Sequence, residues 1–271
     1  MPKLAANLSM MFQEVGFLDR FEAAAAAGFK GIEYLFPYEF PASEIASRLR
    51  RHGLTQALFN LPPGDWASGE RGTAALPGRE DEFMAGVERA LEYAEAIGCT
   101  RLHPMAGIWH GARGEAEALY VSNIRRAADR AALRGVTVLI EPINTRDMPG
   151  YFLTTTSQAL AAMKAVGRPN VKLQLDLYHC QIMEGDLAAH VRGLVRDYAH
   201  VQIAGVPDRR EPDHGEVNYP YLLELLDQVG YGGWVGCEYR PAAETRAGLG
   251  WARRWGVEAS GRPPAEGREQ R

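Results

Sequence analysis

The chain has 271 residues, of which 46% are hydrophobic, and a net charge of −4 at pH 7. This length and near-average composition fit one large domain with room for a buried core. The acidic balance, with no clustered basic stripe, argues against a nucleic-acid partner.

The cysteines and the apolar segments indicate the compartment. Cys99, Cys180 and Cys237 lie far apart without a Cys-x-x-Cys pair, so neither a disulfide framework nor a zinc knuckle is indicated. No apolar stretch is long enough to span a bilayer, and the N-terminus lacks the apolar core of a signal peptide. We therefore expect reduced cysteines, a cytoplasmic location and no membrane partner.

Eight strand-like apolar segments alternate with eight helical patterns along the chain. In chain order, each strand and its following helix are expected at 4–10 and 17–27, 31–36 and 42–51, 55–61 and 79–97, 101–105 and 115–133, 136–143 and 157–166, 171–177 and 187–198, 200–204 and 219–229, and 234–239 and 244–255. Such regular alternation is typical of an α/β fold with a parallel sheet.

Glycines at the helix ends support this reading. Left-handed C-caps are expected at Gly28, Gly53, Gly98, Gly135, Gly167 and Gly230. Eight parallel strands with right-handed crossovers close most economically into a (β/α)8 barrel. An open doubly wound sheet is the rival, weakened because no glycine-rich phosphate loop follows the first strand. We expect one barrel domain over 1–259 and a disordered C-terminal tail over 260–271.

Four strand ends carry a polar residue that can bind a metal. These residues are Glu141, Asp176, Gln202 and Glu238, each at the last inward-facing position of its strand. Three carboxylates and one amide oxygen suit Mg²⁺ or Mn²⁺. A surface ion pair or a helix cap explains any one of them equally well. Four at the same depth favour a cation site, because a buried carboxylate cluster repels itself.

Longer motifs occur at 7–12, 33–38, 60–72, 141–144, 176–179, 202–204, 215–219 and 236–240. Together they resemble the hydroxypyruvate isomerase family, which belongs to the xylose-isomerase-like TIM barrels. The similarity runs from Leu4 to about Trp255, and the segment from Gly64 to Gly72, Gly-Asp-Trp-Ala-Ser-Gly-Glu-Arg-Gly, is its most specific part.

The resemblance implies an isomerase that interconverts hydroxypyruvate and tartronate semialdehyde. It implies Glu141 and Glu238 as the acid/base pair, and a divalent metal held by Glu141, Asp176, Gln202 and Glu238. The chemistry fits these residues, because an aldose-ketose shift needs a proton removed from one carbon and returned to the next. A metal on the two oxygens would stabilise the enediolate between these steps. Either glutamate can start the reaction.

The carboxylate of such a small 2-oxo or hydroxy acid substrate calls for cationic groups. The candidates are His179, Arg71, Arg209 and Arg210. The resemblance supports His179 as a site residue, and its alternative is a histidine that caps a loop or helix. Adjacent Arg209 and Arg210 cannot easily both point inward, so at most one is expected to touch the substrate.

Three further residues lie where they can contribute to the site. Trp66 belongs, with Arg71, to a long loop that can close over a small ligand, although it can equally pack on the barrel rim. Glu33 and Asn7 end the second and first strands. Both are hydrogen-bonding candidates, and Glu33 can instead pair with an arginine of a neighbouring loop.

Other functions remain open. Met105-Ala-Gly107 resembles the related 2-oxo-tetronate isomerases, so a four-carbon 2-oxo acid is the first alternative to hydroxypyruvate. An abasic-site endonuclease of the same superfamily needs a histidine-rich zinc cluster and a basic groove. Here the histidines are scattered, as His103, His110, His179, His200 and His214. A binding barrel without catalysis is a third alternative. Barrels of this kind often associate, so a homo-oligomer is also considered, with no interface named.

Overall fold

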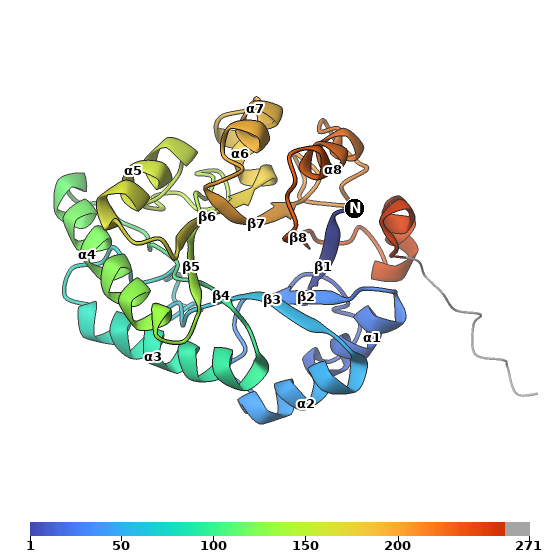
Figure 1. Cartoon of the computed structure of the whole chain (residues 1–271), viewed down its shortest axis with the longest axis horizontal. Helices are drawn as coiled ribbons and strands as arrows, with labels where there is room; N and C mark the ends of the chain where they lie inside the picture. Colours follow the sequence, from blue (N-terminus) through green and yellow to red (C-terminus); the bar gives the residue numbers. More distant parts are fainter. Residues whose placement is uncertain (258–271) are drawn as a thin grey trace, which may run out of the picture.

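The computed structural model describes residues 1–257, and its strands form a closed parallel barrel (Figure 1). The strands are β1 (Lys3–Asn7), β2 (Gly31–Tyr34), β3 (Thr55–Asn60), β4 (Arg101–His103), β5 (Thr137–Ile140), β6 (Val171–Asp176), β7 (Tyr198–Ile203) and β8 (Trp234–Cys237). β8 closes the barrel against β1, with Lys3 opposite Trp234. The predicted (β/α)8 fold is confirmed, and the tail predicted over 260–271 lies outside the described residues.

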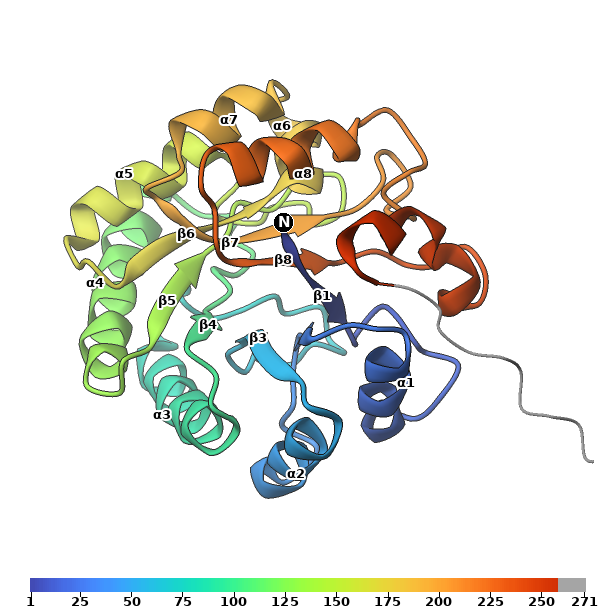
Figure 2. The ribbon, with the colours of Figure 1, turned by 45° about the vertical axis from the view of Figure 1, so that its right-hand side comes forward.

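Helices surround the strands on the outside of the barrel (Figures 1 and 2). They are α1 (Arg20–Ala26), α2 (Ala42–His52), α3 (Glu80–Ile97), α4 (Arg113–Ala132), α5 (Thr156–Val166), α6 (Leu177–Met183), α7 (Leu187–Gly193) and α8 (Tyr219–Gln228), with 3₁₀ segments at Phe17–Asp19 and Thr245–Trp255. In α3, for example, Phe83, Val87, Leu91 and Ala94 are buried, which is the spacing of one helical face against the sheet.

The glycines predicted at helix ends have the expected backbone. All six have positive φ, and Gly53 and Gly98 are the C-caps of α2 and α3. A backbone with positive φ is higher in conformational free energy for an L-residue with a Cβ than for glycine. The three cysteines are buried and unpaired. In residues 1–257 no helix has both the length and the apolar character needed to cross a bilayer.

Several predicted boundaries were wrong at the strand ends. The strand expected over 4–10 ends at Asn7, because the chain turns there and the N–H groups of Met10 and Met11 donate to the Asn7 carbonyl. The segments expected at 31–36, 55–61, 101–105, 136–143, 171–177 and 234–239 also end one to three residues early. Their apolar runs continue into the loops above the barrel, so hydrophobicity alone extends each strand too far.

The helices around β6 and β7 also differ from the prediction. α6 was not predicted, and it begins directly after β6 because Asp176 caps it, accepting the N–H of Tyr178 at 2.7 Å. The helix expected over 187–198 ends at Gly193, because Tyr198 already begins β7. The final helix, expected over 244–255, is a 3₁₀ segment rather than an α-helix.

Candidate active site

The four predicted metal-binding residues meet at the C-terminal end of the barrel. Glu141 and Glu238 directly follow β5 and β8, Asp176 ends β6, and Gln202 lies in β7. The register places Asp176 beside Gln202, and Gln202 beside Gly236. All four side chains are buried. Parallel pairing therefore gathers residues separated by nearly a hundred positions in the sequence.

A cavity of about 280 Å³ opens over this cluster. Its polar lining includes Glu141, Glu238, His179, Arg209 and Arg240, and its apolar lining includes Leu35, Trp66, Met105, Ile143 and Met148. A small polar ligand would fit this volume with polar groups at one side and apolar side chains around the rest.

Arg209 lies at the centre of the carboxylate cluster. Its guanidinium is 3.3 Å from the Glu238 carboxylate, 3.8 Å from Asp176 and 3.4 Å from Asp147. It also lies 4.9 Å from the ring centre of Tyr178. Burial lowers the pKa of Arg209, but the carboxylates of Glu238 and Asp176 raise it more, so the group stays charged. Arg209 therefore balances part of the negative charge of the cluster.

The pKa values of the three carboxyl groups in the cluster are raised. Burial and the charges of Glu238 and Asp176 raise the pKa of Glu141 well above its usual value. The pKa of Glu238 is raised to about 8 by burial, despite the opposing effect of Arg209. Burial also raises the pKa of Asp176 to about 6. Groups that titrate near neutral pH are suited to accept and return a proton.

Within residues 1–257, two oxygens of the cluster have no hydrogen-bond partner. They are Oε1 of Glu141 and Oδ2 of Asp176, both buried. Donor atoms of Glu141, Asp176 and His179 also lie within 4.8 Å of one another. Buried carboxylate oxygens without a donor are costly unless a cation or a proton satisfies them. With the His179 nitrogen beside them, Glu141 and Asp176 therefore have the donor atoms to hold a divalent cation.

Asn7 and Glu33 lie in the barrel interior and do not line the cavity. Glu33 accepts hydrogen bonds from Asn7 at 3.0 Å and from the Gln202 amide at 2.9 Å, and its other oxygen is 2.6 Å from His200 Nε2. The amide oxygen of Gln202, expected as a metal ligand, accepts from Gln174 at 2.6 Å. These hydrogen bonds hold both ends of the Gln202 amide in the barrel interior.

The other predicted site residues take different positions. Trp66 lines the cavity, but Arg71 does not: its guanidinium lies 3.9 Å from the Trp66 ring centre and donates to the Trp66 and Glu70 carbonyls. Of the two adjacent arginines, Arg209 lines the cavity, whereas Arg210 donates to the carbonyls of Arg240 and Pro241.

The histidines are less scattered than their sequence positions suggested. His103, His179 and His200 are all buried. His103 and His200 lie in β4 and β7, where alternate residues face inward, and His179 lies in α6 directly after β6. His103 Nδ1 is 3.4 Å from a Glu141 oxygen. Burial lowers the pKa of His103 to about 3, so this ring is neutral beside Glu141. His103 was missed as a site residue, although its inward position near a strand end was a readable signal.

His179 is held in the cluster by its neighbours. Its Nδ1 is 2.6 Å from the Asn144 amide nitrogen, and its Nε2 is 3.5 Å from Asp176 Oδ2. Burial and the charge of Arg209 lower its pKa well below the usual value. Arg240 also lines the cavity and was assigned no role from sequence. Its position two residues after Glu238 was the available signal.

Comparison with known proteins agrees with this architecture. The sequence model of the xylose isomerase-like TIM barrel family matches residues 21–255. The chain is 59% identical to the 2-oxo-tetronate isomerase of Cupriavidus necator, over 93% of this chain and 97% of that protein. It is 45% identical to the hydroxypyruvate isomerase of Escherichia coli, over 93% and 98%. A crystal structure named AP endonuclease, family 2, from Brucella melitensis is 56% identical, with a TM-score of 0.93 over 94% of this chain and 99% of that one.

Proposed function

The chain belongs to the xylose isomerase-like TIM barrel family, and on that premise we propose that it isomerises short 2-oxo acids with a hydroxyl group on the neighbouring carbon. The lead reaction is the interconversion of hydroxypyruvate and tartronate semialdehyde. One observation carries this proposal: two buried glutamates with raised pKa values, Glu141 and Glu238, line one small cavity.

The two glutamates have the properties that the reaction needs. One takes a proton from the hydroxyl-bearing carbon, and a proton returns to the carbon that carried the carbonyl. The hydroxyl proton crosses to the other oxygen in the same exchange. In the metal-free protein the pKa of Glu238 lies near 8, so this group exchanges a proton close to neutral pH. Neutral His179 and charged Arg209, which line the same cavity, would orient the substrate oxygens.

We propose Mg²⁺ or Mn²⁺ as the cofactor, held by Glu141, Asp176, Gln202 and Glu238. Two of these four ligands are supported by carboxylate oxygens, of Glu141 and Asp176, that have no hydrogen-bond partner within residues 1–257. To join them, the amide oxygen of Gln202 would have to leave Gln174. When bound, the cation would hold the two substrate oxygens and stabilise the negative charge of the enediolate.

A four-carbon 2-oxo-tetronate is the second candidate substrate. The observation that favours it is the higher identity to the 2-oxo-tetronate isomerase of Cupriavidus necator, 59% against 45% for the hydroxypyruvate isomerase of Escherichia coli. A cytoplasmic location and a homo-oligomeric state remain predictions.

The two substrates are compared directly by kcat/KM with the protein loaded with Mg²⁺ or Mn²⁺. We expect turnover of at least one of the two acids, and the larger kcat/KM identifies the preferred chain length.

Duplex DNA with an abasic site is assayed in parallel, with Zn²⁺ added. In residues 1–257 the two groups of side chains that could hold a metal contain one histidine each, so we expect no cleavage. Cleavage of the DNA without isomerisation would overturn the proposal.

A further inference from the structure

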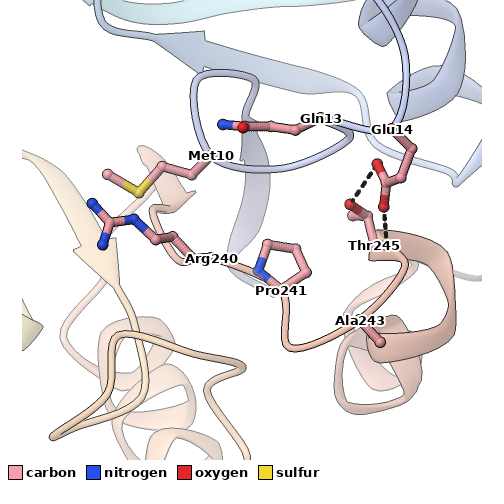
Figure 3. Close-up of a pocket in the computed structure, with 7 residues that line it drawn as sticks. All are labelled: Met10, Gln13, Glu14, Arg240, Pro241, Ala243 and Thr245. Atoms are coloured by element: carbon pink, nitrogen blue, oxygen red, sulfur yellow. Dashed lines mark hydrogen bonds between the residues drawn. The ribbon is translucent and has the colours of Figure 1, made fainter.

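A second pocket adjoins the catalytic cavity at its mouth. It has a volume of about 410 Å³ and lies between the loop after β1 and the segment after β8 (Figure 3). Met10, Gln13 and Arg240 line both this outer pocket and the catalytic cavity. Arg240 therefore stands at the boundary between the two spaces.

The arginines near the cavity differ in how far their charge is balanced. Arg209 lies within 4 Å of three carboxylates. Arg71 stacks on Trp66 and donates to backbone carbonyls. Within the part of the chain that the structure describes, Arg240 forms no ion pair, and its guanidinium donates no hydrogen bond. It is therefore the cation of the cavity lining whose charge is left for a ligand.

The backbone of Arg240 is nevertheless fixed. Its N–H donates to the Arg209 carbonyl at 2.9 Å, and its own carbonyl accepts from Arg210. The acid of the outer pocket, Glu14, is engaged elsewhere, because its carboxylate accepts from the backbone N–H and the hydroxyl of Thr245 (Figure 3). The guanidinium of Arg240 is thus carried on a fixed backbone and extends beside Met10 (Figure 3).

We propose that Arg240 binds the carboxylate of the substrate, while Arg209 balances the catalytic carboxylates; this rests on the proposed function. A guanidinium binds a carboxylate through two parallel N–H···O bonds. A substrate carboxylate placed among Glu141, Asp176 and Glu238 would be repelled by them once these groups have lost their protons. Placed on Arg240 at the mouth, it leaves the neighbouring carbons directed into the cavity, where Glu141 and Glu238 lie.

The test is binding of D-glycerate, which has the same three-carbon acid skeleton but no carbonyl to isomerise. Its Kd is measured by calorimetry on the Mn²⁺-loaded wild type and on Arg240→Gln, Arg240→Lys and Arg51→Gln, the last an exposed arginine of α2. We expect Arg240→Gln to weaken binding by about 10- to 100-fold, Arg240→Lys to weaken it less, and Arg51→Gln to leave it unchanged.

Kinetics on hydroxypyruvate give the second readout. We expect Arg240→Gln to raise KM by a similar factor with a smaller change in kcat, and to leave the Kd for Mn²⁺ unchanged. The inference is overturned if D-glycerate binds Arg240→Gln as tightly as it binds the wild type. It is also overturned if D-glycerate binds neither protein. If glycerate binding depends on Arg240 but the wild type isomerises no 2-oxo acid, the proposed function fails and the carboxylate site stands.

Discussion

At Glu141 and Glu238, burial and neighbouring charge act on side chains that face the same cavity. If both transfer protons, replacing either carboxylate by an amide removes one proton transfer. We expect Glu141→Gln and Glu238→Gln each to lower kcat by about 100- to 10 000-fold. Steady-state kinetics on the preferred substrate measures this loss. Glu95→Gln, an exposed change on α3, is the matched control and should have wild-type kinetics. Either cavity variant with more than about a tenth of wild-type kcat would contradict the assignment.

The same carboxylates predict how pH changes the stability of the metal-free protein. Glu238 keeps its proton up to about pH 8 in the folded protein, whereas in the unfolded chain it loses it near its usual pKa of 4.5. The folded state therefore binds more protons in this window, so the free energy of unfolding falls as pH rises. A cation that replaces the protons should raise the Tm more at pH 8 than at pH 6.

Thermal unfolding with and without Mn²⁺ at pH 6, 7 and 8 measures this difference. The samples without Mn²⁺ are brought to equal ionic strength with NaCl, which separates specific binding from screening. Equal Tm increases at pH 6 and pH 8 would show that the added cation does not compete with protons at the carboxylate cluster.

At the scale of elements, the loop between β3 and α3 is fixed against the barrel by Gly72. Gly72 has a φ of +106° and bridges to Ala106, and a Cβ on it would come within 2.1 Å of the Met105 carbonyl oxygen. This loop carries Trp66 to the cavity, so its position affects substrate binding.

Gly72→Ala and Gly78→Ala separate backbone strain from loop displacement. Gly78 also has positive φ, but a Cβ there would meet no atom of residues 1–257 within 4 Å. We expect Gly78→Ala to cost about 1 kcal/mol of unfolding free energy and Gly72→Ala about 3 kcal/mol. Only Gly72→Ala should also raise KM. Denaturant unfolding and kinetics measure both effects, and equal costs for the two variants would show that the contact at Met105 does not fix the loop.

The sequence predicted the barrel and the gathering of the carboxylates, because both follow from apolar runs and from parallel pairing. It did not predict α6, since Asp176 serves as strand end and helix cap at once. It also could not show which arginine is free, because Arg209 and Arg240 differ only in their three-dimensional neighbours. Charge balance within a site is a property of tertiary contacts, so sequence spacing does not reveal it.

At the scale of the whole molecule, the barrel depends on closure between its first and last strands. β1 pairs with both β2 and β8, and Asn7 at its end supports Glu33. Deleting residues 1–7 would leave edges on β2 and β8 and remove this support. We expect the deletion to abolish cooperative unfolding and to promote aggregation. Lys3→Gln, which changes only a surface contact with Trp234, should cost less than about 0.5 kcal/mol.

Unfolding followed by circular dichroism and light scattering tests this dependence. A deletion variant that does not aggregate and unfolds with the wild-type midpoint would show that β1 is dispensable, and that the fold is stable as an open sheet.

The most direct measurement is a proton NMR time course of hydroxypyruvate and of 2-oxo-tetronate in D₂O, with metal-stripped protein before and after Mg²⁺ addition and with Glu141→Gln as the inactive control. Magnesium is used because Mn²⁺ would broaden the signals. We expect the isomeric 2-hydroxy-3-oxo acid to appear only with metal, an aldehyde from hydroxypyruvate and a ketone from 2-oxo-tetronate. It should carry deuterium from the solvent at C2, the carbon that held the carbonyl, and the variant should form none at a comparable rate. Failure of both acids to react with the metal-loaded wild type, or equal reaction by Glu141→Gln, would contradict the proposed function.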